Sequence, residues 1–558
     1  MIITWLKLKN KIPAINKNHF TIKEGKLTRM LIPFIFSIFV FSGSLKAQES
    51  HSLYQNHTFR HYDRYVYQAK ERFHTSVKPY LKTQTDSIVL LDSIYSKPVN
   101  TKFADILFNR SLIQYKKNDF SFTIDPLFQF ELGRDKTYDE KSWINTRGIL
   151  VNAQLGKKVT VSTSFYENQA SFFDYRHDRI QDIGQRVVPG QGAGKSFGDS
   201  TQHNYDYGFS EAWVSFTPNE HFNFTFGHGK NFIGDGYRSL FLSDNAFNYP
   251  FLRITTDFWN IKYVNLWMQL QDIRNKPQFE SPYNKKWASM HYLDWSVTPW
   301  LTFGFFEAII WQHADTSGVR GFDMNYANPV IFLRPVEFSV GSPDNALMGV
   351  SGKLTLFKNH VFYGQAMIDE FKLSEIKARN GWWANKWAFQ AGYKTFDLFN
   401  WQHLDVQTEF NYVRPFMYSH YSTLQNYGHH NQPLAHPLGS NFWESLTFLR
   451  YQHKRIFIEG RFSYARHGSD TAGMNYGNNI YSSYDTRAKE YDNYLGQAQT
   501  INLSYTSLML AYLVNPRTNL NVYVAYTRRN EQINSISNKQ SLITFGIRTS
   551  LQNFYYDF

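Results

Sequence analysis

The sequence of 558 residues contains no cysteine. This absence excludes disulfide bonds, thiolate metal sites and a lipid-modified cysteine at a processed N-terminus. Long apolar runs are missing as well, because no stretch beyond residue 47 reaches the roughly 18 uninterrupted apolar residues that a transmembrane helix requires. The mean hydropathy of −0.47 is that of a soluble protein. Outer-membrane barrels give similar values, because half of each strand faces a polar interior.

Positive charge is concentrated near the N-terminus. The formal net charge is +13, and seven of the basic residues lie between Lys7 and Arg29. They precede LIPFIFSIFVFSG (31–43), an apolar run of thirteen residues that is too short to span a bilayer. The pattern predicts an N-terminal extension and cleavable signal peptide over residues 1–47, with cleavage after Ala47. Because its removal leaves a much smaller charge, we expect no nucleic-acid partner.

Aromatic residues and alternating segments dominate the rest of the chain. Phe, Trp and Tyr make up 18% of all residues. In LDVQTEFNY (404–412) mostly apolar residues alternate with Asp, Gln, Glu and Asn, which is typical of a strand with one apolar and one polar face. Residues 159–165, 222–226 and 520–526 repeat this pattern. We expect most aromatic side chains in girdles near the strand ends.

The connections between these segments fall into two classes. TPNE (217–220) and FKNH (357–360) are tight turns, whereas residues 175–207 and 418–441 form long connections. Short turns at one end and long loops at the other are the layout of an outer-membrane barrel. The sequence therefore predicts an all-β fold, a transmembrane outer-membrane β-barrel of about 16–18 antiparallel strands over residues 118–558.

The two ends of the processed chain have their own patterns. Residues 48–117 are basic and aromatic with helical stretches, so we expect a small, partly helical periplasmic segment or plug. At the C-terminus the alternation of Phe545, Ile547, Thr549 and Leu551 predicts a closing amphipathic strand that runs toward a terminal aromatic residue.

Two patterns resemble nucleotide-binding or catalytic motifs. PGQGAGKS (189–196) has proline where a Walker A loop needs its first glycine, and no helix pattern follows, so we interpret it as a flexible surface loop. Asp369 and Glu370 are adjacent, and adjacent residues of a strand point to opposite faces, which disfavours an acid–base pair. A surface enzyme would also need a spaced His, Ser and Asp or Glu set at one rim. We therefore expect no enzymatic activity and no cofactor.

Two further segments could hold a ligand. The stretch 229–254 contains glycines and a Ser-Asp-Asn cluster, but it completes no G-x-G-x-x-G motif and no βαβ unit surrounds it. We interpret it as a long connection that folds over or into the lumen. His429, His430 and His436 lie close together in sequence without a carboxylate in the cluster, which favours a structural loop over a metal site.

Several of these segments resemble one known protein family. GHGKNFIGDGYRSLFLSDNAFNYPFLRI (227–254) resembles the Wzi-like capsule-assembly family of outer-membrane barrels, and more closely its RemB-like gliding-motility members. RGFDMNYANPVIFLRPVEFSVGSPDNAL (320–347) and NQPLAHPLGSNFWE (431–444) support the resemblance. With the YYDF end, these segments span most of residues 220–558.

The resemblance implies a monomeric barrel of about eighteen strands, blocked by a periplasmic helical piece and by inward-folded loops. Such proteins bind surface polysaccharide and help to anchor capsule, and the RemB-like members are linked to gliding over surfaces. The sugar-contacting residues of the family do not map onto this chain one by one, so none is transferred.

The hypothesis is a non-enzymatic outer-membrane protein that supports gliding motility by binding or assembling surface polysaccharide. The alternative is a porin or transporter with an open lumen. Expected partners are outer-membrane lipids, surface polysaccharide, and gliding adhesins or other gliding components. The loop residues that we expect to contact a ligand are Tyr237, Arg238, Asp244, Asn245, Asn325, Arg334, His429, His430 and His436. Gly234, Gly236 and Pro250 are expected to shape the 229–254 connection.

Overall fold

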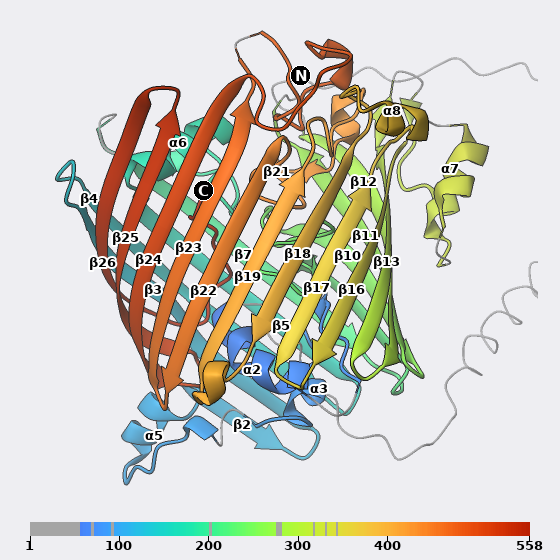
Figure 1. Ribbon diagram of the computed structural model, residues 1–558. Coiled ribbons are helices and arrows are strands. Elements are labelled where there is room, and N and C mark those ends of the chain that lie inside the picture. Colours follow the sequence, from blue (N-terminus) through green and yellow to red (C-terminus); the bar gives the residue numbers. More distant parts are fainter. Residues whose placement is uncertain are drawn as a thin grey trace, which may run out of the picture. The chain divides into compact units, whose positions relative to one another are not determined.

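The computed structural model describes residues 56–68, 72–90, 94–199, 203–274, 282–315, 318–329, 332–341, 344–471 and 473–558. The expected signal peptide lies outside the described residues. The dominant feature is a closed antiparallel barrel of 18 strands (Figure 1). Neighbouring strands of the barrel follow one another in the sequence, and the last strand pairs with the first to close the ring. The prediction of an outer-membrane type of barrel is thereby confirmed, at the upper end of the expected strand count.

The barrel strands are β3 (Phe120–Asp135), β4 (Lys141–Leu155), β5 (Val159–Ser171), β7 (Asn204–Phe216), β8 (Phe222–Gly229), β10 (Tyr249–Phe258), β11 (Ile261–Asp272), β12 (Asn284–Thr298), β13 (Leu301–Gln312), β16 (Asn345–Leu356), β17 (His360–Ile368), β18 (Trp387–Thr395), β19 (Leu404–Val413), β22 (Phe442–His453), β23 (Ile456–Ser469), β24 (Gln499–Asn515), β25 (Leu520–Ile533) and β26 (Ile536–Arg548). Short strands outside this ring are β1 (Val77–Lys78), β2 (Ile113–Lys117), β6 (Lys195–Ser196), β9 (Phe232–Ile233), β14 (Ala314–Asp315), β15 (Gly318–Val319), β20 (Gly428–His429) and β21 (Gln432–Pro433).

The α-helices are short. They are α2 (Asn56–Gln68), α3 (Lys82–Asp86), α5 (Lys102–Phe108), α6 (Asp174–Ile183), α7 (Arg334–Val340) and α8 (Leu373–Ala378). The 3₁₀ turns are η2 (Met324–Ala327), η3 (Leu398–Asn400), η4 (Thr423–Gln425) and η5 (Tyr484–Thr486). Among the described residues, no helix has the length and apolar character that a membrane crossing would need.

The polar and apolar faces of the strands are inverted relative to a soluble protein. On β19, Gln407, Glu409 and Asn411 are buried inside the barrel, while Phe410 and Tyr412 lie on the opposite face. Large apolar side chains are exposed on many strands: Phe130, Leu132, Phe165, Phe226, Phe303, Val350, Phe362, Leu449, Phe462, Leu508, Val524 and Phe545. An apolar outer surface is the arrangement that a bilayer stabilises. The interior combines such polar residues with a buried apolar cluster that includes Leu266, Met290 and Phe306.

The two rims of the barrel differ. At one end, which we term the short-turn rim, strands are joined by brief connections such as 156–158, 259–260 and 454–455. At the other end, the loop rim, long connections include 172–203 and 414–441. This asymmetry is the predicted one, and it places the large loops together at a single mouth of the barrel.

The N-terminal segment fills the lumen near the short-turn rim (Figure 1). Strand β1 pairs with β9, a part of the connection between β8 and β10. From α2, the Tyr67 hydroxyl donates to Asp235 Oδ1 at 2.7 Å. Thr75 Oγ1 donates to the same carboxylate oxygen at 2.5 Å, and Lys78 Nζ donates to the Gly234 carbonyl at 2.7 Å. The partly helical segment is thus tied to an inward-folded loop.

The connection 230–248 runs inside the barrel and is buried over nearly all of its length. A Cβ atom at Gly236 would lie 2.3 Å from Glu409 Oε2 and 2.6 Å from the Arg238 carbonyl oxygen, so only glycine fits there. At Gly234 a Cβ atom would lie 2.8 Å from Gln365 Nε2. The next strand, β10, begins at Tyr249, and Pro250 is its exposed second residue.

The C-terminal ten residues differ from the prediction. Strand β26 ends at Arg548, so Thr549 and Leu551 do not continue its alternation. Residues 549–558 instead enter the lumen, and Tyr555, Asp557 and Phe558 are buried there. The reason is electrostatic, because a buried arginine and a lumen-facing strand arginine both pair with the Asp557 carboxylate.

That carboxylate belongs to a buried cluster that we call the lumen charge cluster: Arg238, Glu409, Glu444, Arg461 and Asp557. Arg238 Nη2 lies 2.9 Å from Glu444 Oε1 and 3.1 Å from Asp557 Oδ1, and both carboxylates are almost fully buried. Arg461 Nη1 lies 3.2 Å from Asp557 Oδ2. The Glu409 carboxylate accepts the backbone N–H groups of Tyr237 and Arg238. The cluster therefore joins a loop, the three strands β19, β22 and β23, and the C-terminus.

We expect the Arg238→Met substitution to destabilise the protein strongly. It leaves two buried carboxylates without their shared cation, which costs about 3–5 kcal/mol. Unfolding by denaturant in detergent or lipid measures this change. The matched control is Arg134→Met, whose partner Asp139 is exposed, and exposed pairs contribute about 0–1 kcal/mol. Equal effects of the two substitutions would contradict the central role of the cluster.

We further expect the N-terminal segment to loosen in acid. Burial alone would raise the pKa of Asp235, but Lys353, Lys78 and the bonds from Thr75 and Tyr67 bring it below its usual value. A lowered carboxyl pKa stabilises the fold at neutral pH, and this contribution disappears as the pH falls through the folded-state pKa. Hydrogen-exchange protection factors of residues 72–81 should therefore fall below about pH 4.

Asp235→Asn tests the same contact at pH 7. Hydrogen bonds to a charged group contribute about 1.5–3 kcal/mol, so protection in residues 72–81 should fall about ten- to hundredfold. Asp86→Asn is the control, because the Asp86 carboxylate forms a partly exposed pair with Lys82. Unchanged protection in Asp235→Asn would show that other contacts hold the segment.

Candidate functional site

A polar cavity opens among the loops at the loop rim. Its volume is about 620 Å³. The walls come from α6, from the ends of β23, β24 and β25 nearest the loop rim, and from the connections 414–441 and 470–498. We call this space the loop-rim cavity. Cavities at barrel mouths are common ligand sites because a rigid wall there positions several side chains around one space.

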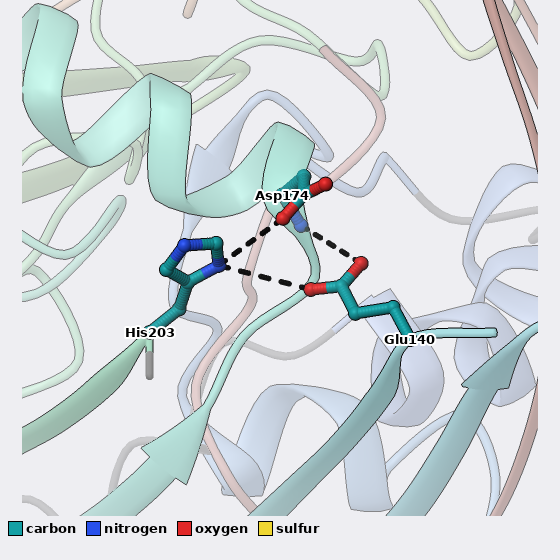
Figure 2. A group of neighbouring side chains, drawn as sticks. All are labelled: Glu140, Asp174 and His203. Carbon is teal, nitrogen blue, oxygen red and sulfur yellow. Dashed lines mark hydrogen bonds and ion pairs between the residues drawn. The ribbon is translucent and has the colours of Figure 1, made fainter. Parts of the chain in front are cut away.

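Helix α6 supplies one wall, and its position is fixed at its start. The Asp174 backbone N–H donates to Glu140 Oε2 at 3.2 Å, which joins the helix to the turn between β3 and β4 (Figure 2). Arg179 Nη2 donates to the Pro437 carbonyl at 2.8 Å and so joins the helix to the 414–441 connection. The charged residues Asp178, Arg179 and Asp182 of α6 line the cavity.

The opposite wall carries charges on the inner face of β25. Arg529 Nη2 lies 3.2 Å from Glu531 Oε1, and Arg529 Nε donates to the Phe558 carbonyl at 3.0 Å. The Arg529 guanidinium also lies 4.9 Å from the ring centroid of Tyr175. Cations, carboxylates and aromatic faces therefore meet in one space.

The electrostatics of α6 favour hydrogen bonding with a polar ligand. Burial raises the pKa of Asp178, and the charges of Asp174, Asp182 and Glu531 raise it further. Burial likewise raises the pKa of Asp182, although Arg179 acts in the opposite direction. Burial lowers the pKa of the Arg179 guanidinium. Asp178 and Asp182 are exposed and Arg179 is half-buried, so all three can form hydrogen bonds to a ligand with hydroxyl groups that enters the cavity.

Another part of the cavity wall is lined by amide and aromatic side chains. Arg274 lies 4.9 Å from the ring centroid of Tyr481 and pairs with Asp272 at 2.5 Å. Asn431, Asn478, Asn479 and Gln499 add amide groups to the lining. Amides, carboxylates and guanidinium groups bond hydroxyls, and ring faces stack on the apolar faces of sugars.

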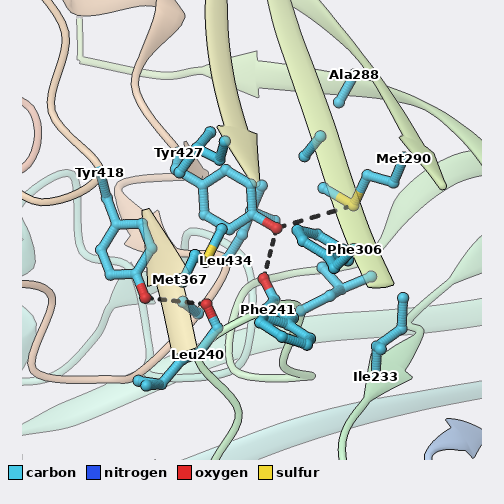
Figure 3. Packing of buried hydrophobic residues seen from close by; sticks show 14 of the residues in the cluster. Ile233, Leu240, Phe241, Ala288, Met290, Phe306, Met367, Tyr418, Tyr427 and Leu434 are labelled. Atoms are coloured by element: carbon cyan, nitrogen blue, oxygen red, sulfur yellow. Dashed lines mark hydrogen bonds between the residues drawn. The ribbon is translucent and has the colours of Figure 1, made fainter. Parts of the chain in front are cut away.

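The loop that contributes Asn431 is held from below by tyrosines. The Tyr418 hydroxyl donates to the Leu240 carbonyl at 2.9 Å, and the Tyr427 hydroxyl donates to the Phe241 carbonyl at 2.5 Å (Figure 3). Both tyrosines are fully buried, so they fix the loop and present no ring to a ligand. Tyr421, by contrast, is exposed, and Trp443 is half-buried on β22.

None of the residues expected to contact a ligand lines the loop-rim cavity. Tyr237 and Arg238 belong to the interior around the lumen charge cluster. The Asp244 carboxylate accepts from Tyr555 and Asn553, and Asn245 donates to the Pro433 carbonyl.

Asn325 and Arg334 lie on the connection 313–344. Asn325 is exposed and bonds Asp323, and Arg334 is exposed beside Glu337. Neither residue lines the loop-rim cavity, so their role in ligand binding stays a prediction.

The three histidines do not form a metal site, because each ring bonds to neighbouring protein groups instead. His429 accepts from the Gln271 backbone N–H, His430 lies 2.9 Å from Gln271 Oε1, and His436 Nε2 lies 2.7 Å from Glu444 Oε2. Burial lowers the pKa of all three imidazoles; that of His430 falls to about 4.

The structure corrects two interpretations from the sequence, those of the Walker-like stretch 189–196 and of the adjacent Asp369 and Glu370. In the Walker-like stretch, Pro189 to Gly192 are buried, and the Gly190 N–H donates to Gln432 Oε1 at 2.7 Å, so this part is not a flexible surface loop. Asp369 and Glu370 do not diverge: both lie about 3 Å from Lys386 Nζ, because β17 ends at Ile368 and the strand geometry stops there.

The cavity-lining residues were not found from the sequence. The signal was present in YRHDRIQDI, where Asp178 and Asp182 are four residues apart and share one face of a helix. A second signal was the alternation of β25, which places Arg529 and Glu531 on the face opposite Val524 and Tyr526. Joining the two required knowledge of which loop folds over which strands.

No family model matches the chain, and no curated protein matches it. Solved structures do match. One is Wzi of Escherichia coli, an outer membrane protein involved in group 1 capsule assembly and a carbohydrate-binding β-barrel. It is 13% identical with a TM-score of 0.52, and the match covers 91% of this chain and 100% of Wzi.

Two further solved structures also match. OccAB2 of Acinetobacter baumannii is 10% identical with a TM-score of 0.41, covering 77% of this chain and 98% of OccAB2. OprD of Pseudomonas aeruginosa is 10% identical with a TM-score of 0.39, covering 76% of this chain and 94% of OprD. The likeness to Wzi shows a shared fold.

Proposed function

We propose that this protein is a non-enzymatic barrel of the bacterial outer membrane that binds surface polysaccharide in the loop-rim cavity. The observation that carries the proposal is the composition of that cavity. It combines cations, carboxylates, amides and aromatic rings in about 620 Å³, a space suited to a few sugar units. Hydroxyl-rich ligands need donors and acceptors at many points of one surface, and this lining supplies both.

The location of the cavity supports the same proposal. An apolar outer surface stabilises the barrel in a bilayer, and the expected signal peptide would export the chain. Long loops of such barrels face outward, so the cavity would face the cell surface. Wzi, which shares the fold, is described as carbohydrate-binding and involved in capsule assembly.

The finer part of the proposal concerns motility. The resemblance of residues 227–254 to RemB-like proteins supports a role in gliding. A barrel that holds surface polysaccharide, and through it gliding adhesins, would couple the outer membrane to the substratum.

We expect the double substitution Asp178→Asn, Asp182→Asn to weaken polysaccharide binding at least about tenfold, because each carboxylate offers charge-assisted hydrogen bonds worth about 1.5–3 kcal/mol. Titration calorimetry of the purified full chain with polysaccharide extracted from the producing cells measures the change. The control is Asp485→Asn, an exposed carboxylate of the same rim outside the cavity. Equal affinities of the two proteins would contradict binding in the cavity.

The same variants test the cellular role. Cells that carry the double substitution should spread less and retain less surface polysaccharide than cells that carry Asp485→Asn. Reduced surface polysaccharide with normal spreading would argue against gliding while leaving the binding proposal in place. Normal values of both would argue against each part.

The alternative, a porin or transporter, requires an open lumen. Residues 72–89, the connection 230–248 and the C-terminal residues 549–558 all occupy the lumen. We therefore expect the full-length protein in planar lipid bilayers to show no steady large conductance. An open porin reconstituted in the same membrane is the control. Steady large conductance of the purified protein would favour the alternative.

A further inference from the structure

A second group of side chains at the loop rim is separate from the lining of the cavity. We propose that Glu140, Asp174 and His203 bind a divalent transition-metal cation of the zinc class (Figure 2). They are the only three residues in the described part of the chain whose potential metal-ligand atoms lie within 4.8 Å of one another.

The distances suit a small cation. His203 Nδ1 lies 3.2 Å from Asp174 Oδ1 and 3.7 Å from Glu140 Oε1. A tetrahedral cation with bonds of about 2.0–2.1 Å separates its ligand atoms by about 3.3–3.4 Å. Side-chain shifts of a few tenths of an ångström would therefore complete three bonds, and water would complete the fourth.

The backbone holds the three residues in place. The Asp135 N–H donates to the Glu140 carbonyl at 2.8 Å, and the Phe172 N–H donates to the His203 carbonyl at 3.0 Å. The ring of His203 also stacks on His177, with centroids 3.8 Å apart. A site whose ligands are positioned in advance loses less entropy when the cation binds.

Negative charge in excess provides a second, independent indication. Asp135 is fully buried next to this turn, and its Oδ2 atom has no hydrogen-bond partner among the described residues. Carboxylates that repel one another in a partly dry site are stabilised by a shared cation.

The ligand types select the class of cation. Calcium and magnesium prefer oxygen ligands throughout, whereas an imidazole nitrogen with two carboxylates suits zinc and similar ions. The competing explanation is a direct interaction of His203 with the two carboxylates, which would need no metal.

The consequence would be mechanical. The three ligands come from the turn before β4, the first turn of α6 and the residue before β7. A bound cation would fix the start of α6, the helix that forms one wall of the loop-rim cavity.

Titration calorimetry with zinc chloride tests the proposal on the full chain, after removal of metal with a chelator. We expect one zinc per chain in the wild type. The triple variant Glu140→Gln, Asp174→Asn, His203→Ala should bind at least about a hundredfold more weakly, because it loses every side-chain ligand. His221→Ala is the matched control, because His221 forms a similar pair with Glu220 at the short-turn rim.

Unfolding temperatures with and without zinc distinguish loss of the metal site from misfolding of a variant. Zinc should raise the unfolding temperature of the wild type and of His221→Ala but not of the triple variant or of His203→Gln, whose metal-free unfolding temperatures serve as references. Absence of zinc binding by the wild type, equal zinc binding by the triple variant, or binding of calcium in preference to zinc would each overturn the proposal. No polysaccharide is used, so the result is independent of the proposed function.

Discussion

The pairing of Arg238 with Glu444 and Asp557 is the interaction on which the interior depends. Its partners come from a loop, a barrel strand and the penultimate residue of the chain, which lie far apart in sequence. A buried charge without a partner is so costly that the three segments either meet or remain solvated. Charge pairing therefore acts together with apolar packing in the lumen, where Leu240 and Phe241 of the inward loop pack in one buried cluster with strand residues such as Phe306. The barrel wall is held by hydrogen bonds between strands.

The lumen charge cluster is also covalently connected to the loop-rim cavity. Asp557 sits in the cluster, and its neighbour Phe558 lines the cavity and bonds Arg529 through its carbonyl. Because one peptide bond separates the two, a shift of the cluster moves the wall of the cavity. The interior thus acts as a rigid support for a site at the barrel mouth.

The sequence predicted the barrel wall well, because a two-residue period records directly which face of a strand is apolar. The lumen-directed course of 230–248 was also expected from its glycines. The course of residues 549–558 was not, since alternation through Leu551 looks like a strand until Asp557 is known to pair with Arg238. The burial of Gly190 against Gln432 was equally hidden, because a contact between residues 242 positions apart leaves no local pattern.

The same reasoning explains why the expected ligand residues and the cavity residues differ. The loop 227–254 attracts notice because it is dense in glycine and charge, yet those features serve close packing at Gly236 and charge pairing at Arg238. Residues such as Asp182 carry no buried partner network, so their side chains are free to meet a ligand at little cost to the fold. The charged residues of α6 and β25 that line the cavity are therefore the ones available to a ligand. The glycine-rich loop 227–254 packs in the interior and supports the barrel mouth.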